Sequence, residues 1–224
     1  MNVTEAILTR MSARAFTDRP VEAALLRRIL ETASHSPSGG NVQPWHVVVL
    51  GGADLARFKA LMRAKLADPR APGDGAEYAI YPKDLGEPYR SRRFKCGEDM
   101  HGTMGIARED KDARYRFIAG NFQFWNAPIG MFVCIDRNMG PPQWADLGIF
   151  VQSVMLLARE HGLHTCPQES WTVWHGAVAE FLHFPASRVL FCGMALGYRD
   201  ESAPINTLRT ERAPLGEIAE FLGF

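Results

Sequence analysis

The sequence predicts a mixed α+β layer structure in which helices outnumber strands. Two observations lead to this prediction. Segments whose apolar residues recur at helical spacing alternate with short apolar runs of the kind that form buried strands. The chain of 224 residues is also 46% hydrophobic and shows no internal repeat, so it can bury one large core. We therefore expect a single domain over residues 1–224.

The first predicted helix covers residues 17–33, TDRPVEAALLRRILETA. Its apolar residues fall on one helical face, Thr17 or Asp18 can cap its start, and Pro20 suits its first turn. The apolar run at 46–50 then predicts a buried strand.

A second helix is predicted over residues 53–68, where apolar residues again mark one face. Residues 68–107 differ, because they are crowded with Gly, Pro and charge and carry few periodic apolar positions. A stretch of this length without regular structure is usually functional. We expect it to be an irregular, variable lid or substrate segment of the domain.

The second half of the chain again alternates between helices and strands. The pattern predicts a helix over 108–125, a strand over 127–135 and the strongest helix of the chain over 144–162, which Gly162 would cap. Shorter elements follow, namely a strand near 163–166, a helix near 174–183 and a strand over 188–198, before an irregular tail.

Composition excludes several kinds of partner. Lys plus Arg and Asp plus Glu both number 25, so no net field would recruit nucleic acid or an anionic membrane. The N-terminus lacks an uninterrupted apolar region, and no apolar run approaches the roughly 20 residues of a membrane span. We expect a soluble, cytoplasmic protein whose four widely spaced cysteines are reduced, and mostly buried, thiols.

Motifs for several common chemistries are absent. The sequence contains no GxSxG, HExxH or GxxxxGK[ST] pattern, and no GxGxxG lies between a strand and a helix. His161 and His164 have no neighbouring ligands, so they are interpreted as surface and loop histidines. Nothing therefore indicates a catalytic nucleophile, a metal centre or a nucleotide-triphosphate site.

Cationic residues gather at both ends of the chain. RMSARAF places Arg10, Ser12 and Arg14 at alternating positions, so an extended backbone would send all three to one side. Arg209 and Arg212 lie in the irregular tail. If the two ends converge, their guanidinium groups would form a site suited to a phosphate. The alternative is a set of solvated surface arginines.

A turn at 36–45, SPSGGNVQPW, leads into the first strand. Pro and Gly make it a turn, and amide side chains follow directly before the apolar run. It is either a simple connection or a loop that lets the backbone approach a ligand. The residues concerned are Pro37, Ser38, Gly39, Asn41 and Gln43. Trp45 is expected to anchor the strand start in the core.

Four segments in order resemble the FMN-dependent nitroreductase family. They are RMSARAF, SPSGGNVQPWHVVV, GLHTCPQESW and LGYRDESAPINTLRTERAPL, and together they span nearly the whole chain. The resemblance implies α+β subunits with a central mixed sheet flanked by helices. Two such subunits would form an interlocked homodimer with two FMN molecules at the subunit interface, each contacted by both chains.

The resemblance also implies roles for the terminal cations. Arg10 and Arg212 would hold the FMN phosphate, and Arg209 is a weaker candidate because this tail departs from the closer K-x-R form. Ser12 would meet ribityl or phosphate oxygens, and Arg14 would lie near the pyrimidine edge of the flavin. A fixed cation there stabilises the charge of the reduced ring.

Other contacts implied by the resemblance come from two loops. The partner subunit would supply the polar turn, that is Pro37, Ser38, Gly39, Asn41 and Gln43. In CPQESW the backbone N–H near Glu169 would point at flavin N5, among the cofactor-binding residues Pro167, Gln168, Glu169 and Ser170. No catalytic side chain is expected, because the cofactor carries the chemistry.

Candidate substrate residues are Tyr78, Lys83, Phe122, Phe124 and Trp125. The three aromatic residues near 124 would either line a slot beside the flavin or pack a helix end. Glu77, Tyr78 and Lys83 resemble the acid, aromatic and basic lid of iodotyrosine deiodinase, a relative in the same superfamily.

The resulting functional hypothesis is an NAD(P)H-driven, ping-pong oxidoreductase that reduces nitroaromatic or quinone-type acceptors by hydride transfer through flavin N5. The alternatives are a reductive dehalogenase like iodotyrosine deiodinase and a flavin-binding protein without turnover. The partners expected are a second copy of the chain, FMN, NAD(P)H and a small aromatic electron acceptor, with no nucleic acid and no membrane.

Overall fold

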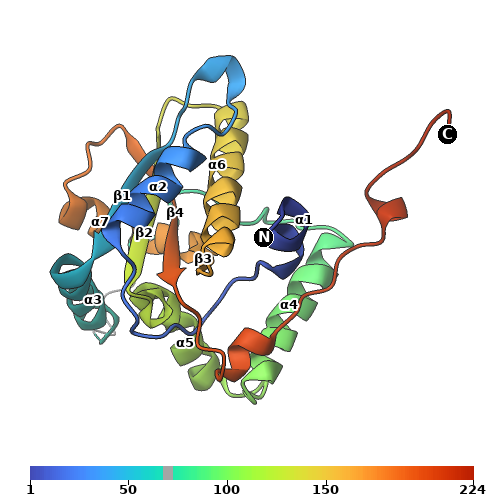
Figure 1. The fold of residues 1–224 in the computed structure, drawn as a ribbon. Coiled ribbons are helices and arrows are strands. Elements are labelled where there is room, and N and C mark those ends of the chain that lie inside the picture. Colours follow the sequence, from blue (N-terminus) through green and yellow to red (C-terminus); the bar gives the residue numbers. More distant parts are fainter. Residues whose placement is uncertain (68–72) are drawn as a thin grey trace.

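A four-stranded sheet forms the centre of the computed structural model, which describes residues 1–67 and 73–224 (Figure 1). Its strands lie in the order β1-β2-β4-β3 and every neighbouring pair is antiparallel. They are β1 (His46–Gly51), β2 (Ile129–Asp136), β3 (His164–Gln168) and β4 (Arg188–Gly197). The predicted α+β fold is confirmed, whereas the mixed character of the sheet reduces to one isolated parallel bridge between Ser12 and Thr165.

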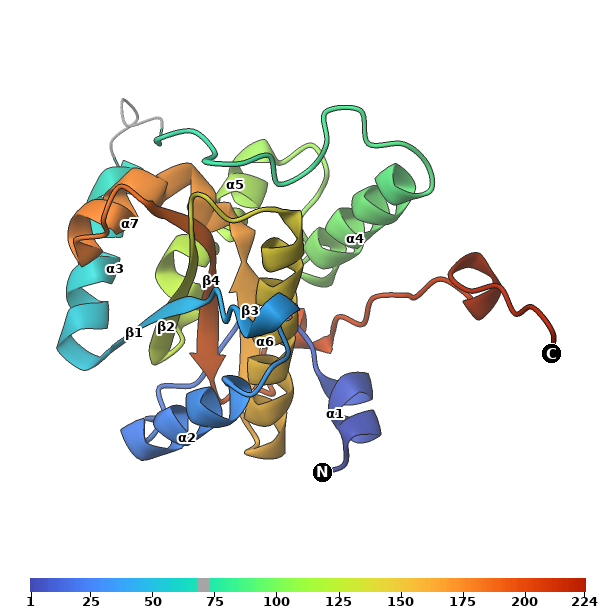
Figure 2. The ribbon, with the colours of Figure 1, turned by 90° about the horizontal axis from the view of Figure 1, so that it is seen from above.

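Seven α-helices and several short 3₁₀ turns surround this sheet in the described part of the chain (Figure 2). The helices are α1 (Val3–Thr9), α2 (Ala23–Ala33), α3 (Gly52–Ala67), α4 (Tyr89–Thr103), α5 (Lys111–Ala119), α6 (Pro141–Glu160) and α7 (His175–Leu182). The 3₁₀ turns are η1 (Gly39–Asn41), η2 (Gly120–Asn126), η3 (Glu169–Trp174), η4 (Pro204–Thr207) and η5 (Leu215–Glu217). Both figures show α4 and the C-terminal tail on the side of the molecule away from α3.

Alternating side chains of β2 divide the core into two layers. Met131, Val133 and Ile135 pack with α2 and α6 on one face of the sheet. Phe132 and Cys134 face the other layer, which α3, α7, η2 and η3 complete. The period of two along a fully buried strand explains why its apolar run is continuous.

The first predicted helix begins later than its sequence pattern indicated. The backbone N–H and the hydroxyl of Thr17 both donate to the carbonyl oxygen of Tyr198, at 2.9 and 3.3 Å. The Arg19 guanidinium also lies over the Tyr198 ring, 3.8 Å from its centroid. These contacts hold the segment extended, so α2 starts only after Glu22.

The predicted loop at 68–107 contains the 15-residue helix α4, so that part of the prediction is wrong. Only His101 of this helix is buried, which explains why no apolar period marked it. Its Arg, Lys and Glu residues are strong helix formers, and Lys95 pairs with Asp99 one turn later. Residues 68–72, also within that prediction, lie outside the described part of the chain.

The helix predicted over 108–125 ends early. α5 stops at Ala119, and Phe124, Trp125 and Asn126 adopt left-handed φ values of 50°, 52° and 63°. The Trp125 ring folds back over Gly120, where a Cβ would lie 2.5 Å from the ring. Tight aromatic packing therefore outweighs helix propensity here.

The remaining predictions concern membrane-spanning segments and the cysteines. In residues 1–67 and 73–224, no helix combines the length and apolar character required to span a bilayer. Cys134, Cys166 and Cys192 are buried and Cys96 is exposed, and all four are free thiols as expected.

Candidate functional site

The N-terminal segment that carries the predicted cations runs beside β3. Ser12 bridges Thr165, and the backbone N–H of Ala13 donates to the Thr165 carbonyl at 3.0 Å. The buried amide of Asn206 accepts from the N–H of Arg14 at 2.9 Å, and its Nδ2 donates to Ala15. A residue of the C-terminal tail therefore fixes the N-terminal segment.

The two ends of the chain converge on one cavity of about 590 Å³. Among the described residues that line it, none is acidic. The lining comprises Arg10, Ser12, Arg14, Arg209 and Arg212 together with Ile7, Leu8, Met11, Cys96, Leu208 and Thr210. The four arginines thus converge on one cavity, in which Arg10 and Arg14 are half-buried and Arg209 and Arg212 are exposed.

Electrostatics in this cavity favour an anion. Burial lowers the pKa of Arg10, and the nearby positive charge of Arg212 lowers it further. A partly buried guanidinium group beside another positive charge, with no acid among the described lining residues, would be stabilised by a bound phosphate or carboxylate.

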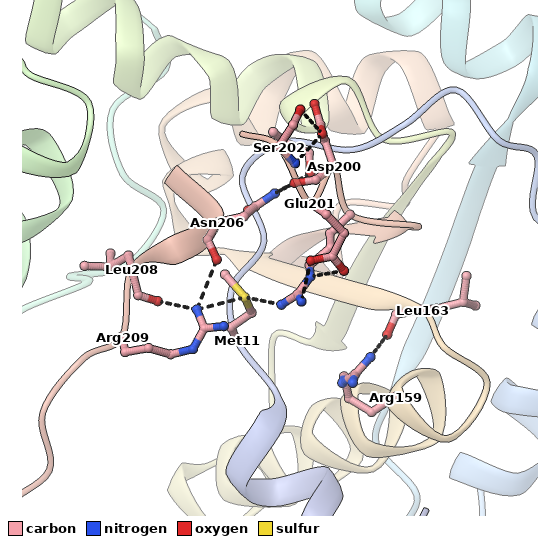
Figure 3. Close-up of polar contacts among 11 residues, drawn as sticks. Met11, Arg159, Leu163, Asp200, Glu201, Ser202, Asn206, Leu208 and Arg209 are labelled. Atoms are coloured by element: carbon pink, nitrogen blue, oxygen red, sulfur yellow. Dashed lines mark hydrogen bonds and ion pairs between the residues drawn. The ribbon is translucent and has the colours of Figure 1, made fainter. Parts of the chain in front are cut away.

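Arg209 contributes to the cavity differently from Arg10 and Arg212. Its Nη1 donates to the carbonyl oxygens of Asn206 and Leu208 at 3.0 and 2.8 Å, and it lies 3.5 Å from the Met11 sulfur (Figure 3). These contacts fold the tail upon itself. Arg209 therefore serves to hold the tail as well as to line the cavity.

Ion pairs with α4 hold the tail on either side of Arg212. Lys95 lies 3.3 Å from a carboxylate oxygen of Glu211, and Arg92 pairs with Glu217. The side chain of Arg212 is exposed and donates to the Thr210 hydroxyl at 2.7 Å. Helix α4, which the sequence patterns did not reveal, thus holds the tail on both sides of Arg212.

His164 is buried, contrary to its interpretation as a surface or loop histidine. It begins β3 and is only 5% exposed, and neither ring nitrogen has a hydrogen-bond partner in the described chain. Burial lowers the pKa of His164 to about 4, and the positive charges of Arg159 and Arg199 add to that effect. Figure 3 shows Arg159 beside the start of β3, donating to the carbonyl of Leu163.

The turn that follows β3 uses its predicted residues unequally. Gln168 is 2% exposed, and its side-chain amide bonds Asn121 and Trp171 inside the protein. Its side chain is therefore directed into the protein, which leaves the backbone of Gln168 for any contact with a cofactor. Pro167 is half-buried and Glu169 is exposed. The Ser170 hydroxyl oxygen is buried and has no partner among the described residues.

Within the polar turn at 36–45, Pro37 and residues 39–43 are exposed, and two of them have a strained backbone. Asn41 and Gln43 adopt φ values of 56° and 51°. The N–H of Gly39 donates to the buried carboxylate of Asp146 at 3.3 Å, and Ser38 Oγ accepts from the Gln43 N–H at 2.9 Å. These residues and the exposed Pro37 do not line the cationic cavity of their own chain.

Trp45 anchors the end of this turn, as expected. Its ring stacks on Phe150 of α6 with centroids 5.0 Å apart. The left-handed backbone of Asn41 and Gln43 in this turn is typical of segments that contact a ligand or another chain.

Two of the candidate substrate aromatics pack in the core. Phe124 is fully buried against Phe132 and Trp171, and Phe122 is 8% exposed. Of the two alternatives, helix-end packing thus fits both. Trp125 is also buried but borders a second cavity of about 480 Å³, which Arg14 lines as well.

The predicted lid triplet is partly fixed to the sheet. The Tyr78 hydroxyl donates to the Phe191 carbonyl oxygen of β4. Glu77 pairs with Arg137 at 2.6 Å and accepts from the N–H of Leu190 at 3.0 Å. Only Lys83 of the three is exposed to solvent. Burial raises the pKa of Tyr78, so this hydroxyl stays protonated.

Three polar residues at these sites had not been singled out from the sequence, namely Asn121, Asp146 and Asn206. Asn206 lies inside the quoted C-terminal segment, which was the available signal. In the described ranges, no group of three or more His, Cys, Asp or Glu side chains could hold a metal ion.

Comparisons with known proteins agree over nearly the whole chain. The model of the Nitroreductase family matches residues 7–198. The 4-nitrobenzoate reductase of Pseudomonas putida is 38% identical over 218 residues, which are 97% of this chain and 94% of that protein.

Solved structures give the same result. The FMN and NADPH-dependent nitroreductase NfnB from Sphigopyxis sp. strain HMH is 43% identical, with a TM-score of 0.96 and full coverage of both chains. The FMN-dependent nitroreductase NfnB from Mycobacterium smegmatis, solved with NADPH, is 29% identical with a TM-score of 0.92, covering 98% of this chain and 97% of that one.

Proposed function

The chain belongs to the nitroreductase family, and from this we propose that it is an FMN-dependent oxidoreductase that uses NAD(P)H to reduce nitroaromatic or quinone-type acceptors. The observation that carries the proposal is the cationic cavity between the two chain ends. Its volume of about 590 Å³ suits a cofactor of the size of FMN, and the positive charge of its lining complements a phosphate.

The residues present fit FMN. Arg10 and Arg212 would hold its phosphate, Ser12 would contact phosphate or ribityl oxygens, and Arg14 would approach the pyrimidine edge of the ring. The orphaned Ser170 hydroxyl supports a polar ligand beside the β3–η3 turn. When bound, FMN would take two electrons and a proton from NAD(P)H and deliver them to the acceptor, in the two halves of a ping-pong cycle.

The backbone after β3 completes the reactive side of the site. The N–H at Glu169 would lie near flavin N5, a role that requires no side chain. This fits a turn whose Gln168 side chain is directed into the protein. The protein would therefore bind and orient FMN, and NAD(P)H and the acceptor would occupy the same open face of the flavin in turn.

The second half of each site would come from a second copy of the chain. The strained turn with Gly39, Asn41 and Gln43 is exposed and lines no part of its own cationic cavity. Exposed apolar side chains on α1 and the extended tail support the same conclusion. They include Ile7, Leu8, Leu215, Ile218, Phe221 and Leu222. Figure 1 shows that tail leaving the body of the subunit, as an interlocked homodimer requires.

Reconstitution with FMN tests the proposal directly. The purified protein should retain a flavin spectrum that NADPH or NADH bleaches without oxygen and that 4-nitrobenzoate restores. Failure to bind FMN would refute the site, and bound flavin that neither nicotinamide bleaches would refute the enzymatic role. Size-exclusion chromatography with light scattering tests the assembly, and a monomer that retains FMN would contradict the shared site.

A further inference from the structure

A buried amide clamp holds the turn after β3. Gln168, the last residue of that strand, donates from Nε2 to the carbonyl oxygen of Asn121 at 3.0 Å and to its Oδ1 at 3.2 Å. Its Oε1 accepts from Trp171 Nε1 at 3.1 Å. One side chain thus links β3 to η2 on one side and to η3 on the other.

The clamp is satisfied at every polar atom of its two amides. Oδ1 of Asn121 also accepts from Trp125 Nε1 at 3.2 Å, and its Nδ2 donates to the Ile118 carbonyl at 2.9 Å. Buried polar networks that are fully satisfied restrict a structure to one conformation, because any shift leaves a group unpaired.

Close packing fixes the same turn from the direction of the sheet. Gly193 of β4 is the register partner of Gln168. A Cβ at Gly193 would lie 2.2 Å from Cδ1 of Trp171, so the indole rests on bare backbone. The indole that bonds Gln168 is therefore itself held in place, and the chain between positions 168 and 171 has little freedom.

We propose that Asn121 and Gln168 are positioning residues, whose amide clamp fixes the β3–η3 turn so that the backbone N–H of Glu169 faces the flavin in one geometry. This inference rests on the proposed function. A hydrogen bond weakens steeply with misalignment, and preorganised donors contribute most where they need not move. An apolar side chain of equal size would fill the space but would not fix the orientation of the Glu169 backbone N–H.

The role differs from simple core packing in what it predicts. Loss of packing lowers stability wherever it occurs, whereas loss of the clamp slows flavin reduction in particular. FMN affinity should change little, because the terminal arginines hold the phosphate on other elements.

The test compares two identical substitutions in the FMN-loaded protein. Gln168→Met removes the clamp. Gln123→Met is the matched control, because Gln123 lies on η2 two residues after Asn121 but bonds Lys59 and Arg63 of α3. Each variant is compared with the wild type in three measurements. These are stopped-flow reduction by NADPH, FMN titration and amide hydrogen exchange over the β3–η3 turn.

Gln168→Met should slow flavin reduction by about 10- to 100-fold, speed exchange at residues 168–171 and leave the FMN dissociation constant near that of the wild type. Gln123→Met should leave the reduction rate unchanged. A wild-type rate in Gln168→Met, or equal slowing in both variants, would overturn the positioning role.

A second pair keeps the test decisive if Gln168→Met does not fold. Asn121→Ala removes the Oδ1 that accepts from Gln168 and Trp125 and should slow flavin reduction, whereas Gln123→Ala on the same turn should reduce at the wild-type rate. Equal rates in these two variants would refute the clamp. A wild-type protein that NAD(P)H cannot reduce would refute the proposed function, and the clamp with it. A reducible wild type with normal variants refutes the clamp alone.

Discussion

Acid should destabilise this protein through His164, and His164→Leu should remove that sensitivity. The folded-state pKa of His164 is about 4, below the ordinary 6.5, because burial and nearby arginines disfavour the charged ring. Below pH 6.5 the unfolded chain therefore takes up a proton that the folded chain refuses. Stability is unaffected above that pH, falls as pH drops from 6.5 towards 4, and then levels off.

The magnitude follows from the two pKa values. Between pH 7.5 and pH 5.0 the linkage amounts to about 2 kcal/mol, and its full extent below pH 4 is about 3 kcal/mol. For a chain of this size, 2 kcal/mol corresponds to roughly 4–8 °C in melting temperature. His164→Leu should lack this part of the acid sensitivity, because neither ring nitrogen has a partner to lose.

Urea unfolding at the two pH values, at fixed protein and FMN concentrations, measures the effect. The quantity of interest is the loss of unfolding free energy in the wild type minus that in His164→Leu. His35→Leu, at an exposed position after α2, is the matched control and should lose as much as the wild type. A difference below about 0.5 kcal/mol between the wild type and His164→Leu would refute the reasoning.

Three further predictions concern the site and its support. Arg212→Ala should weaken FMN binding by about 1.5–3 kcal/mol in a fluorescence titration, with partial recovery in Arg212→Lys; unchanged affinity would remove Arg212 from the site. Asp146→Ala removes the acceptor for the Gly39 N–H and should weaken FMN binding by about 1 kcal/mol, whereas Asp146→Asn keeps an acceptor oxygen and should lose less. Gly193→Ala should cost about 1–3 kcal/mol of stability or more, because its Cβ meets an indole ring at 2.2 Å. Gly148→Ala, with no atom within 4 Å of its Cβ, is the control for thermal unfolding.

The elements that sequence patterns predicted are those whose stability comes from burial. β2 is buried along almost its whole length and α6 buries one long face, so both leave a clear apolar period. α4 is held differently. Arg114 pairs with Glu98 through both carboxylate oxygens, at 2.6 and 3.0 Å, and Lys95 pairs with Asp99. Charged pairs on an exposed face carry no period of hydrophobicity, so this helix could not be recognised.

The cations of the site could be predicted, but the groups that hold them could not. Arg10 and Arg212 stand out in the sequence because guanidinium groups have the chemistry that suits an anion, and both line the same cavity. Asn206 joins the two ends through a hydrogen bond to a residue 192 positions away. A single amide in a tail carries no local signal of such a contact, and Asp146 near the start of α6 carries none either.

Gln168 shows what a motif position alone does not specify. The motif CPQESW placed Gln168 among the expected cofactor-binding residues without distinguishing its backbone from its side chain. Along β3, however, Gln168 shares a face with Cys166, two residues earlier, which packs in the core layer of α3 and η2. The strand period therefore directs Gln168 inward, onto Asn121 of η2. Because the Gln168 side chain points to the opposite face of β3 from Pro167, its amide can hold the backbone of the turn from the core side.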